Sequence, residues 1–333
     1  MSILSGELVW RRPAEVSDLA TNGGRITATA IPSGVKNNLF PNVPQAERVT
    51  GSTKYRKAFI HVANDDGLAL IAPKVYVVAP TPGDDRVTIF AGTQTNTQAG
   101  ITGTEQQYGA GTLNAAAGLG ATTCQVLVEN AVDALFKSGM TVRISDRQTV
   151  DGVGNEQFLV LASDATYSGN VATLTFTTTP LAYNFQTASP TYVSSVYTPS
   201  DVQASVTDFA ITSALGTFDT VNHPVVPHGV GSIEQLWTLT FTSSTTYTAS
   251  GDTVGAIGTG TIGTNFVPAN PNFSKPFFTL PSAGFGGTYA NGNTIQFRTH
   301  PAAIPIWYKR TVPPGANSIS ANKVSVAVDG ESE

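Results

Sequence analysis

The chain has 333 residues, of which 41% are hydrophobic and only 12% are charged, and its formal net charge is −5. This negative balance disfavours non-specific binding of nucleic acid, which requires a basic surface. The single cysteine, Cys124, excludes an intramolecular disulfide, and no run of about 18 apolar residues is present to form a membrane-spanning helix.

The pattern of apolar residues predicts an almost all-β fold. Helical 3.6-residue spacing is scarce, whereas short alternating runs recur between clusters of Gly, Pro, Asn and Asp. Abundant Thr suits a pleated strand, and abundant Gly suits turns. We therefore expect a β-sandwich built from N- and C-terminal segments, with a small β-barrel domain inserted between them.

Residues 1–50 are expected to form an extended, loop-rich N-terminal arm. One short strand is predicted in it, from Arg25 to Ile31, after the turn Asn22-Gly-Gly. An arm of this kind can wrap its own domain or a neighbouring subunit. Any longer regular element is interrupted by the prolines Pro13, Pro32, Pro41 and Pro44.

Residues 51–104 are expected to supply the first part of the split sandwich, beginning with a strand over Lys54–Val62. In the turn that follows, Gly67 supplies a positive φ. Further strands are predicted over Leu68–Val78 and Arg86–Ala91. Residues 93–120 are poor in large apolar groups and are interpreted as a linker.

Residues 105–197 are expected to be the inserted small β-barrel, because short strands follow one another at close spacing. Insertion of such a unit at an exposed loop is well tolerated. A serial arrangement of three units is the alternative. The predicted strands cover residues 120–128, 141–145, 156–162 and 169–176, with a short helical turn over 131–140.

Residues 198–333 are expected to complete the sandwich, with a strong strand over 235–242. The Gly/Thr tract 245–265 is either a long hairpin or a flexible loop. The C-terminal run is an aromatic-rich strand, a Pro-Pro-Gly break and a further strand. We expect this run to close the sandwich that Lys54–Val62 opens, and its last strand to be an edge available to a neighbour.

No catalytic, cofactor-binding or metal-binding pattern is recognisable, so we expect no enzyme, no cofactor and no metal. Acidic pairs beside Gly are explained by turn formation, and the histidines lack the further ligands that a zinc site needs. A cation-binding loop and a glycan-cleaving enzyme, which needs paired carboxylates in a cleft, are the rival interpretations. The acidic residues concerned are Asp65, Asp66, Asp84, Asp85, Asp146, Asp151 and Glu156.

Adjacent aromatic residues in the last third are the main interface candidates. They form the pairs Phe277-Phe278 and Trp307-Tyr308, and neighbouring side chains of a strand point to opposite faces. One member of each pair should therefore lie outside the core, where aromatic residues typically anchor interfaces. Packing against the arm or loops and a sugar-binding platform are the alternatives.

Basic residues are few, and none of their groupings predicts a nucleic-acid site. Lys54, Arg56 and Lys57 form the densest cluster. Alternation places Lys54 and Arg56 on one strand face, which we interpret as solvated. Arg11 and Arg12, in the N-terminal arm, join the aromatic pairs as interface candidates.

Several strings carry a family resemblance. They are Ser33-Gly-Val-Lys-Asn-Asn-Leu-Phe-Pro, Thr81-Pro-Gly-Asp-Asp-Arg-Val and Pro305-Ile-Trp-Tyr-Lys-Arg-Thr-Val-Pro-Pro-Gly, with Gly120-Ala-Thr-Thr and the stretch from Lys137 to Asp146. They resemble virion structural proteins encoded among the tail and baseplate genes of Mu-like and related tailed bacteriophages. Gly139-Met140 stands where a Gly-Asp step is commoner in that group. The motifs are structural and transfer no catalytic residue.

The resemblance implies a non-enzymatic structural protein of a phage virion, most simply a tail or baseplate component that mediates subunit assembly. The expected partners are copies of itself and other virion proteins, with neither nucleic acid nor a membrane span. The expected location is the virion, assembled in the cytoplasm of the bacterial host, since no secretory signal is evident. The alternatives are a receptor-binding adhesin that contacts a host surface glycan and a capsid decoration or head–tail connector protein.

Overall fold

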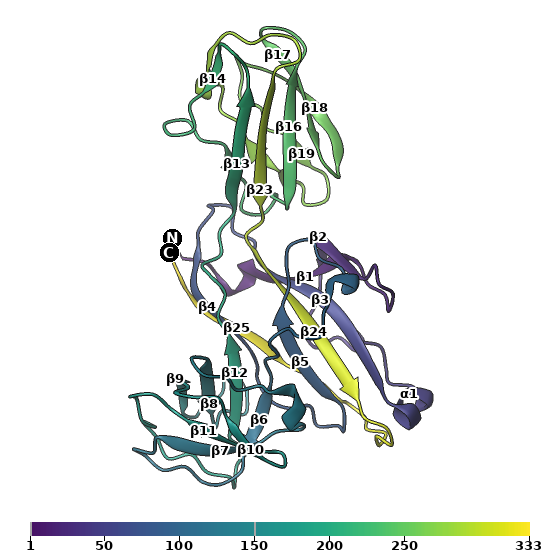
Figure 1. Cartoon of the computed structure of the whole chain (residues 1–333), viewed down its shortest axis with the longest axis vertical. Coiled ribbons are helices and arrows are strands. Elements are labelled where there is room, and N and C mark those ends of the chain that lie inside the picture. Colours follow the sequence, from purple (N-terminus) through teal and green to yellow (C-terminus); the bar gives the residue numbers. More distant parts are fainter. Residues whose placement is uncertain (1, 150) are drawn as a thin grey trace.

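The computed structural model describes residues 2–149 and 151–333, so Met1 and Val150 lie outside the description. Its regular structure is almost entirely β, which confirms the expected all-β, sandwich-type fold. Figure 1 shows an elongated molecule with three β units, and both termini lie beside the middle one. We call these the distal unit (residues 205–300), the inserted unit (residues 105–197) and the central unit, which comprises the remaining residues.

The central unit is organised around a five-stranded sheet with the order β2-β1-β3-β24-β5. β24 pairs antiparallel with β3 from Ala303 opposite His61 to Val312 opposite Ser52. The C-terminal run therefore lies beside the Lys54–Val62 segment, as the sequence predicts. The strands are β1 (Leu8–Glu15), β2 (Gly23–Ala30), β3 (Ser52–Val62), β5 (Arg86–Ala91) and β24 (Ala303–Val312).

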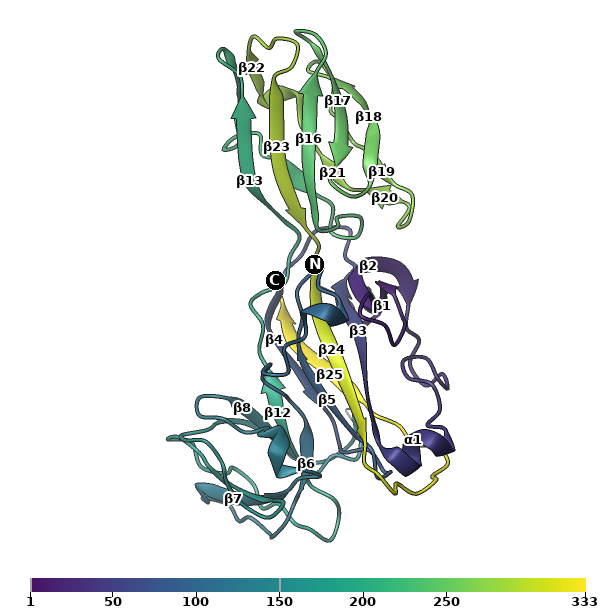
Figure 2. The ribbon, with the colours of Figure 1, turned by 45° about the vertical axis from the view of Figure 1, so that its right-hand side comes forward.

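A second layer packs on one face of this sheet. It contains β4 (Leu70–Val77), β25 (Val326–Ser332) and the end of β12 (Tyr192–Tyr197). Figure 2 shows β4, β25 and β5 running beside β24 through the middle of the molecule. The last strand, β25, ends the strand order of its sheet beside β4, so it forms an edge, as expected. The core between the layers contains Ile60, Val75, Val77, Ile89 and Ile306.

The N-terminal segment differs from the expected extended arm over residues 1–50. β1 pairs with β3 from Leu8 opposite Val62 to Arg11 opposite Phe59, so the segment belongs to the sheet. Pro13 is accommodated because the β1–β2 ladder shifts register on both sides of it. The long loop of the segment follows Ala30 and ends in helix α1 (Gln45–Thr50).

The predicted linker also differs, because residues 93–108 cover the second face of the five-stranded sheet. The Lys57 ammonium, 1% exposed in this layer, donates hydrogen bonds to the Gly24 and Asn96 carbonyls at 2.8 and 2.9 Å. Its burial lowers its pKa to about 7. Tyr108 bridges to Ile89 of β5. The sheet is therefore covered on both faces.

The inserted unit is a curved sheet around its own core and does not close into the expected barrel. Continuous ladders join the strands in the order β10, β11, β7, β6, β12, β8 and β9. The ends of β9 and β11 are joined by one isolated bridge, between Leu161 and Phe176. The strands are β6 (Ala110–Leu113), β7 (Thr123–Leu127), β8 (Thr141–Ser145), β9 (Glu156–Val160), β10 (Thr166–Ser168) and β11 (Val171–Thr175), followed by the first residues of β12.

The distal unit has its own sheet, with the order β13-β23-β16-β17-β18. The single sandwich expected from residues 51–104 and 198–333 is thus divided, since residues 205–300 form a separate sheet and core. The strands are β13 (Ser205–Thr212), β16 (Gln235–Phe241), β17 (Thr246–Gly251), β18 (Gly255–Thr261) and β23 (Thr294–His300). Three short pairs complete it: β14 (Gly216–Phe218) with β22 (Phe285–Gly287), β15 (Val226–Pro227) with β21 (Phe278–Thr279), and β19 (Ala269–Asn270) with β20 (Lys275–Pro276).

The core of the distal unit is rich in aromatic rings. Trp237, Phe241 and Tyr247 are fully buried in it, and Tyr289 stacks on Phe241 at 3.9 Å between centroids. A Cβ on Gly260 would lie 2.5 Å from Cζ of Tyr247. The Gly/Thr tract is therefore a strand hairpin, in which glycine makes room for a buried ring.

Candidate interface sites

The aromatic pair Trp307-Tyr308 is buried, contrary to the expectation that one ring would face a neighbour. Trp307 is 0% exposed and Tyr308 is 5% exposed. Trp307 stacks on Phe90 with 6.3 Å between the ring centroids, on the face that residues 93–108 cover. Tyr308 packs against Trp10 on the opposite face, with 6.5 Å between the ring centroids. Because both faces of the sheet are covered, alternation directs neither ring to the surface.

The pair Phe277-Phe278 is buried as well, with exposures of 3% and 0%. Both rings pack on Trp237, at centroid distances of 4.8 and 5.2 Å. Phe278 begins a two-residue strand enclosed within the distal unit. The four aromatic candidates therefore stabilise the chain's own cores and are not surface anchors.

Arg11 does lie at an interface, but between two units of the same chain. Its Nε donates a hydrogen bond to Nδ1 of His61 at 2.8 Å, and its guanidinium lies 5.1 Å from the ring centre of Phe273 in the distal unit. The Nε2 atom of His61 lies 3.2 Å from the carbonyl oxygen of Gly229, also in the distal unit. We call this contact region the distal joint.

His61 is neutral in the distal joint. It is 0% exposed, and its burial, together with the nearby charge of Arg11, lowers its pKa to about 4. Because Arg11 donates to Nδ1, that nitrogen carries no proton, and Nε2 carries the proton that is donated to the Gly229 carbonyl. One ring thus connects β1 to the distal unit only while it is uncharged.

Apolar packing and ion pairs complete the distal joint. Ile26 and Phe59 of the central unit belong to the same apolar cluster as Trp237 of the distal unit. Lys275 pairs with Asp65 at 2.6 Å. Arg25 donates from Nε to the carbonyl of Glu234 at 2.8 Å. Asp65, one of the turn acids singled out in the sequence, therefore has a partner across the joint.

Arg12 holds the loop that carries the first resemblance string. Its Nη2 donates to the carbonyl of Asn38 at 2.6 Å, and Nη1 of Arg310 donates to the carbonyl of Pro41 at 2.8 Å. The ring of Phe40 lies 5.6 Å from the guanidinium of Arg56 and 4.7 Å from that of Arg310. Cation–π contacts thus attach this loop to the central unit.

The basic cluster of β3 is engaged within the chain. Lys54 and Arg56 share a strand face, as predicted, and both pair with Asp18, at 2.9 and 2.7 Å. Lys54 also pairs with Glu47 at 2.8 Å. Lys57 points to the other face, where it is buried. The cluster therefore differs from the solvated face that the sequence suggested.

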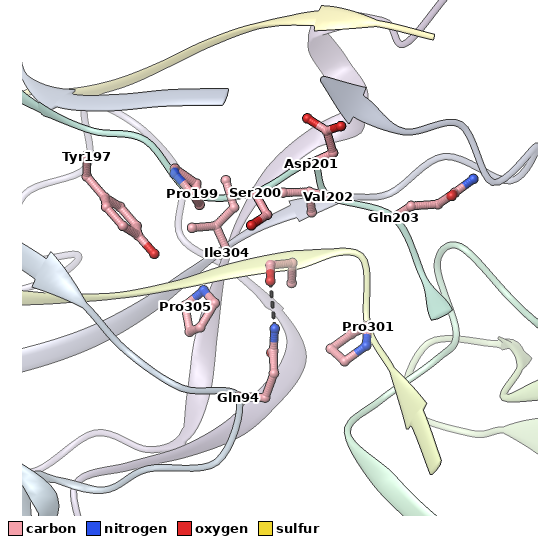
Figure 3. Close-up of a pocket in the computed structure, with 11 residues that line it drawn as sticks. Gln94, Tyr197, Pro199, Ser200, Asp201, Val202, Gln203, Pro301, Ile304 and Pro305 are labelled. Carbon is pink, nitrogen blue, oxygen red and sulfur yellow. Dashed lines mark hydrogen bonds between the residues drawn. The ribbon is translucent and has the colours of Figure 1, made fainter. Parts of the chain in front are cut away.

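A small pocket lies where the chain crosses between the central and distal units (Figure 3). Its volume is about 220 Å³, below the roughly 300 Å³ at which small-molecule sites usually begin. Gln94 donates from Nε2 to the carbonyl of Ala303 across it, at 2.7 Å. The one carboxylate in its lining, Asp201, accepts the backbone N–H of Ala72 at 2.8 Å. The prolines Pro199, Pro301 and Pro305 form much of its wall.

Two further acidic candidates, Asp84 and Asp85, and the buried cysteine have structural roles. Asp84 and Asp85 accept hydrogen bonds from Asn317 and Asn322 and so hold the loop before β25. Burial raises the pKa of Cys124 to about 12. Across residues 2–149 and 151–333, no group of three or more His, Cys, Asp or Glu side chains is placed to hold a metal ion. Within the same residues, no helix is long and apolar enough to cross a membrane.

Two buried polar groups were missed by sequence reasoning: Lys57, which holds layers of the central unit together, and His61, which contacts the distal unit. Both lie on the alternating face of β3 that also carries Phe59. A polar residue at such a position indicates a buried partner, but the partners come from residues 24, 96, 11 and 229, far away in the chain.

No family model, no curated protein and no solved structure matches this chain.

Proposed function

We propose that this protein is a non-enzymatic structural component of a tailed-bacteriophage virion, in the tail or baseplate, and that it mediates subunit assembly. The observation that carries the proposal is the set of contacts that join the three β units of the chain. Arg11 and His61 join the distal unit to the central unit, and the backbone of β12 joins the inserted unit to it, which gives one elongated body.

The connection between the inserted and central units supports a mechanical role. β12 pairs with β6 and β8 through its first residues and with β4 through Val196 and Tyr197. A single strand therefore belongs to both units, and load on the inserted unit passes directly into the central sheet. A spacer or scaffold needs such a connection, because it must hold its neighbours at a defined distance.

The distribution of charge also supports a covered surface. In the distal unit, Arg298 pairs with Asp208 at 3.2 Å and with Glu234 at 3.5 Å. Lys275 pairs with Asp65 of the central unit at 2.6 Å. The lysine and the arginine of this unit are thus near the distal joint or paired within the sheet. Surfaces low in charge are typical of the centres of protein interfaces.

Cryo-electron microscopy of the phage particle tests the proposal. We expect density for this chain in the tail or baseplate, repeated by the local symmetry, with neighbours on the distal unit. Density on the capsid surface or at the portal would instead support the decoration or connector alternative. If purified particles lack the chain, the structural role is refuted.

A receptor-binding role is the second candidate, and the loops at the far end of the distal unit favour it. The turns over residues 242–245 and 288–293 contain Thr, Ser, Asn, Ala, Gly and Tyr but no charged residue. Hydroxyl and amide groups are suitable donors and acceptors for a host glycan. Binding of purified protein to a panel of host polysaccharides tests this candidate, and uniformly negative binding would count against it.

A further inference from the structure

We propose that β18 of the distal unit pairs antiparallel with β18 of a second copy of this chain, so that two distal sheets join into one. The inference deepens the proposed assembly function, on which it rests, by naming a partner and a contact. It starts from the edge of the distal sheet, where β18 pairs with β17 on one side only.

The free side of β18 carries backbone groups ready to pair. The N–H of Ile262 bonds to the carbonyl of Thr245 at 3.0 Å, in the same register as the β17–β18 ladder. Because bonded and non-bonded pairs alternate in an antiparallel ladder, the backbone groups of Thr259 and Thr261 point outward. Within residues 2–149 and 151–333, both groups of Thr259 and the N–H of Thr261 have no backbone partner, whereas the Thr261 carbonyl accepts from Thr264 at 3.3 Å.

Three other strand edges carry features that oppose pairing, whereas β18 carries no charged residue. β25 presents the exposed carboxylates of Asp329 and Glu331. On β13, Asp208 has a φ of 55° and interrupts the ladder with a bulge. β10 is only three residues long. Charges, bulges and short length are the usual means by which natural sheets avoid edge-to-edge association.

The internal packing of the strand does not explain its lack of charge. Gly260 makes room for the ring of Tyr247, and Gly258 has a φ of 134°, a backbone conformation that favours glycine. This accounts for the inward-facing glycines only. Ala256, Thr259 and Thr261 are exposed, so lysine or glutamate would fit there without steric conflict.

A second copy is the occupant that the charge pattern favours. When a strand pairs with its own copy across a two-fold axis, a charge near the axis lies close to the same charge on the partner. β18 can pair with itself without such repulsion, whereas β25 would bring carboxylates together. The pairing would also shield Val254, which is 42% exposed, and the half-buried Ile257.

Sedimentation velocity of the full chain over a range of concentrations tests the proposal. We expect a reversible dimer, and we expect Thr259→Lys to raise its dissociation constant about 10-fold or more, because the two lysines would lie at or next to the two-fold axis. The matched control is Ala210→Lys, an exposed position on β13 at the opposite edge of the same sheet. It should leave the dissociation constant unchanged.

Charge complementation gives the decisive second measurement. An equimolar mixture of Thr259→Lys and Thr259→Glu chains should form heterodimers at concentrations at which each variant alone is monomeric. Amide hydrogen exchange at Thr259 and Thr261 should slow on dimerisation of the unmodified chain. Native near-ultraviolet circular dichroism of each variant confirms that the distal unit is folded.

A monomer at every concentration, or a dimer unaffected by Thr259→Lys, would overturn the inference. A chain that is monomeric in solution but present in the tail would leave the proposed virion role intact. Self-pairing through β18 by a chain that is absent from virions would support the dimer and refute the virion role. The failures of the two proposals are thus distinguishable.

Discussion

The two connections of the central unit are built by different means. The inserted unit is joined through main-chain hydrogen bonds of β12, which pairs with β8 up to Ser195 and with β4 from Val196. The distal unit is joined through side chains, chiefly Arg11, His61 and Phe273, and through apolar contacts. The first connection cannot change without breaking a ladder, whereas the second includes a hydrogen bond that depends on the ionisation of one ring.

The comparison explains how one chain can contain both a fixed and an adjustable connection. Backbone pairing is independent of side-chain identity, so few substitutions at the surface affect it. Side-chain contacts can be weakened one at a time, and their geometry is specific to the residue present. Five predictions separate the two connections, in order of decreasing expected effect.

Trp237→Ala should destabilise the distal unit by about 3–5 kcal/mol, because a fully buried indole that donates to Thr299 is lost. Calorimetry should show one transition moving to lower temperature and a second that is little changed. If all transitions move together by the same amount, the distal unit does not unfold separately and the contrast between the two connections fails.

Ile144→Ala should cost about 2–5 kcal/mol, because Ile144 is fully buried in the core of the inserted unit. Since β12 continues into the central sheet, hydrogen exchange should increase in β4 as well as in β8. Faster exchange confined to the inserted unit would contradict the shared-strand connection.

Acidification should weaken the distal joint. The folded pKa of His61, about 4, lies below its ordinary value of 6.5, so the unfolded chain binds the proton first as pH falls. The contribution of His61 is complete above pH 6.5 and decreases by roughly 1.4 kcal/mol per pH unit towards pH 4. Hydrogen exchange of residues 228–233, followed from neutral solution down to the folded pKa, measures this loss. His61→Gln should flatten the dependence, and an unchanged slope would assign it to other groups.

Arg11→Lys should weaken the distal joint by about 1–2 kcal/mol although the charge is kept. The guanidinium donates to His61 and also to the Ala28 carbonyl while it lies over Phe273. An ammonium group cannot reproduce this planar arrangement. Thermal unfolding of the distal unit measures the effect, and Arg12→Lys, which affects the loop at Asn38, is the control for a change at the neighbouring position.

Asp65→Asn should have the smallest effect, about 0.2–1 kcal/mol, because its pair with Lys275 is largely exposed. The effect should diminish further at high salt. Comparing the variant with the unmodified chain at low and high ionic strength checks both statements. A loss as large as that of Arg11→Lys would show that surface ion pairs, and not the buried residues, hold the joint.

Many strands are predictable from local pattern because alternation and turn chemistry act within a few residues. The predicted strand over residues 141–145 coincides with β8, and that over Arg86–Ala91 coincides with β5. Gly67 has the expected positive φ, 71°. The candidate interface residues were less predictable. Burial of Trp307 and Tyr308 depends on layers contributed by distant segments, which no local pattern reveals.

The amino-acid sequence by itself determined the all-β class, the positions of the main strands and the absence of an intramolecular disulfide, because each depends on composition or short-range periodicity. The tertiary structure alone decided that residues 205–300 form a separate unit, that β12 is shared between sheets and that Arg11 meets His61. These depend on contacts between residues far apart in the chain, which arise only when the sheets pack. The same long-range packing left β18 as an uncharged edge at the outside of the distal sheet.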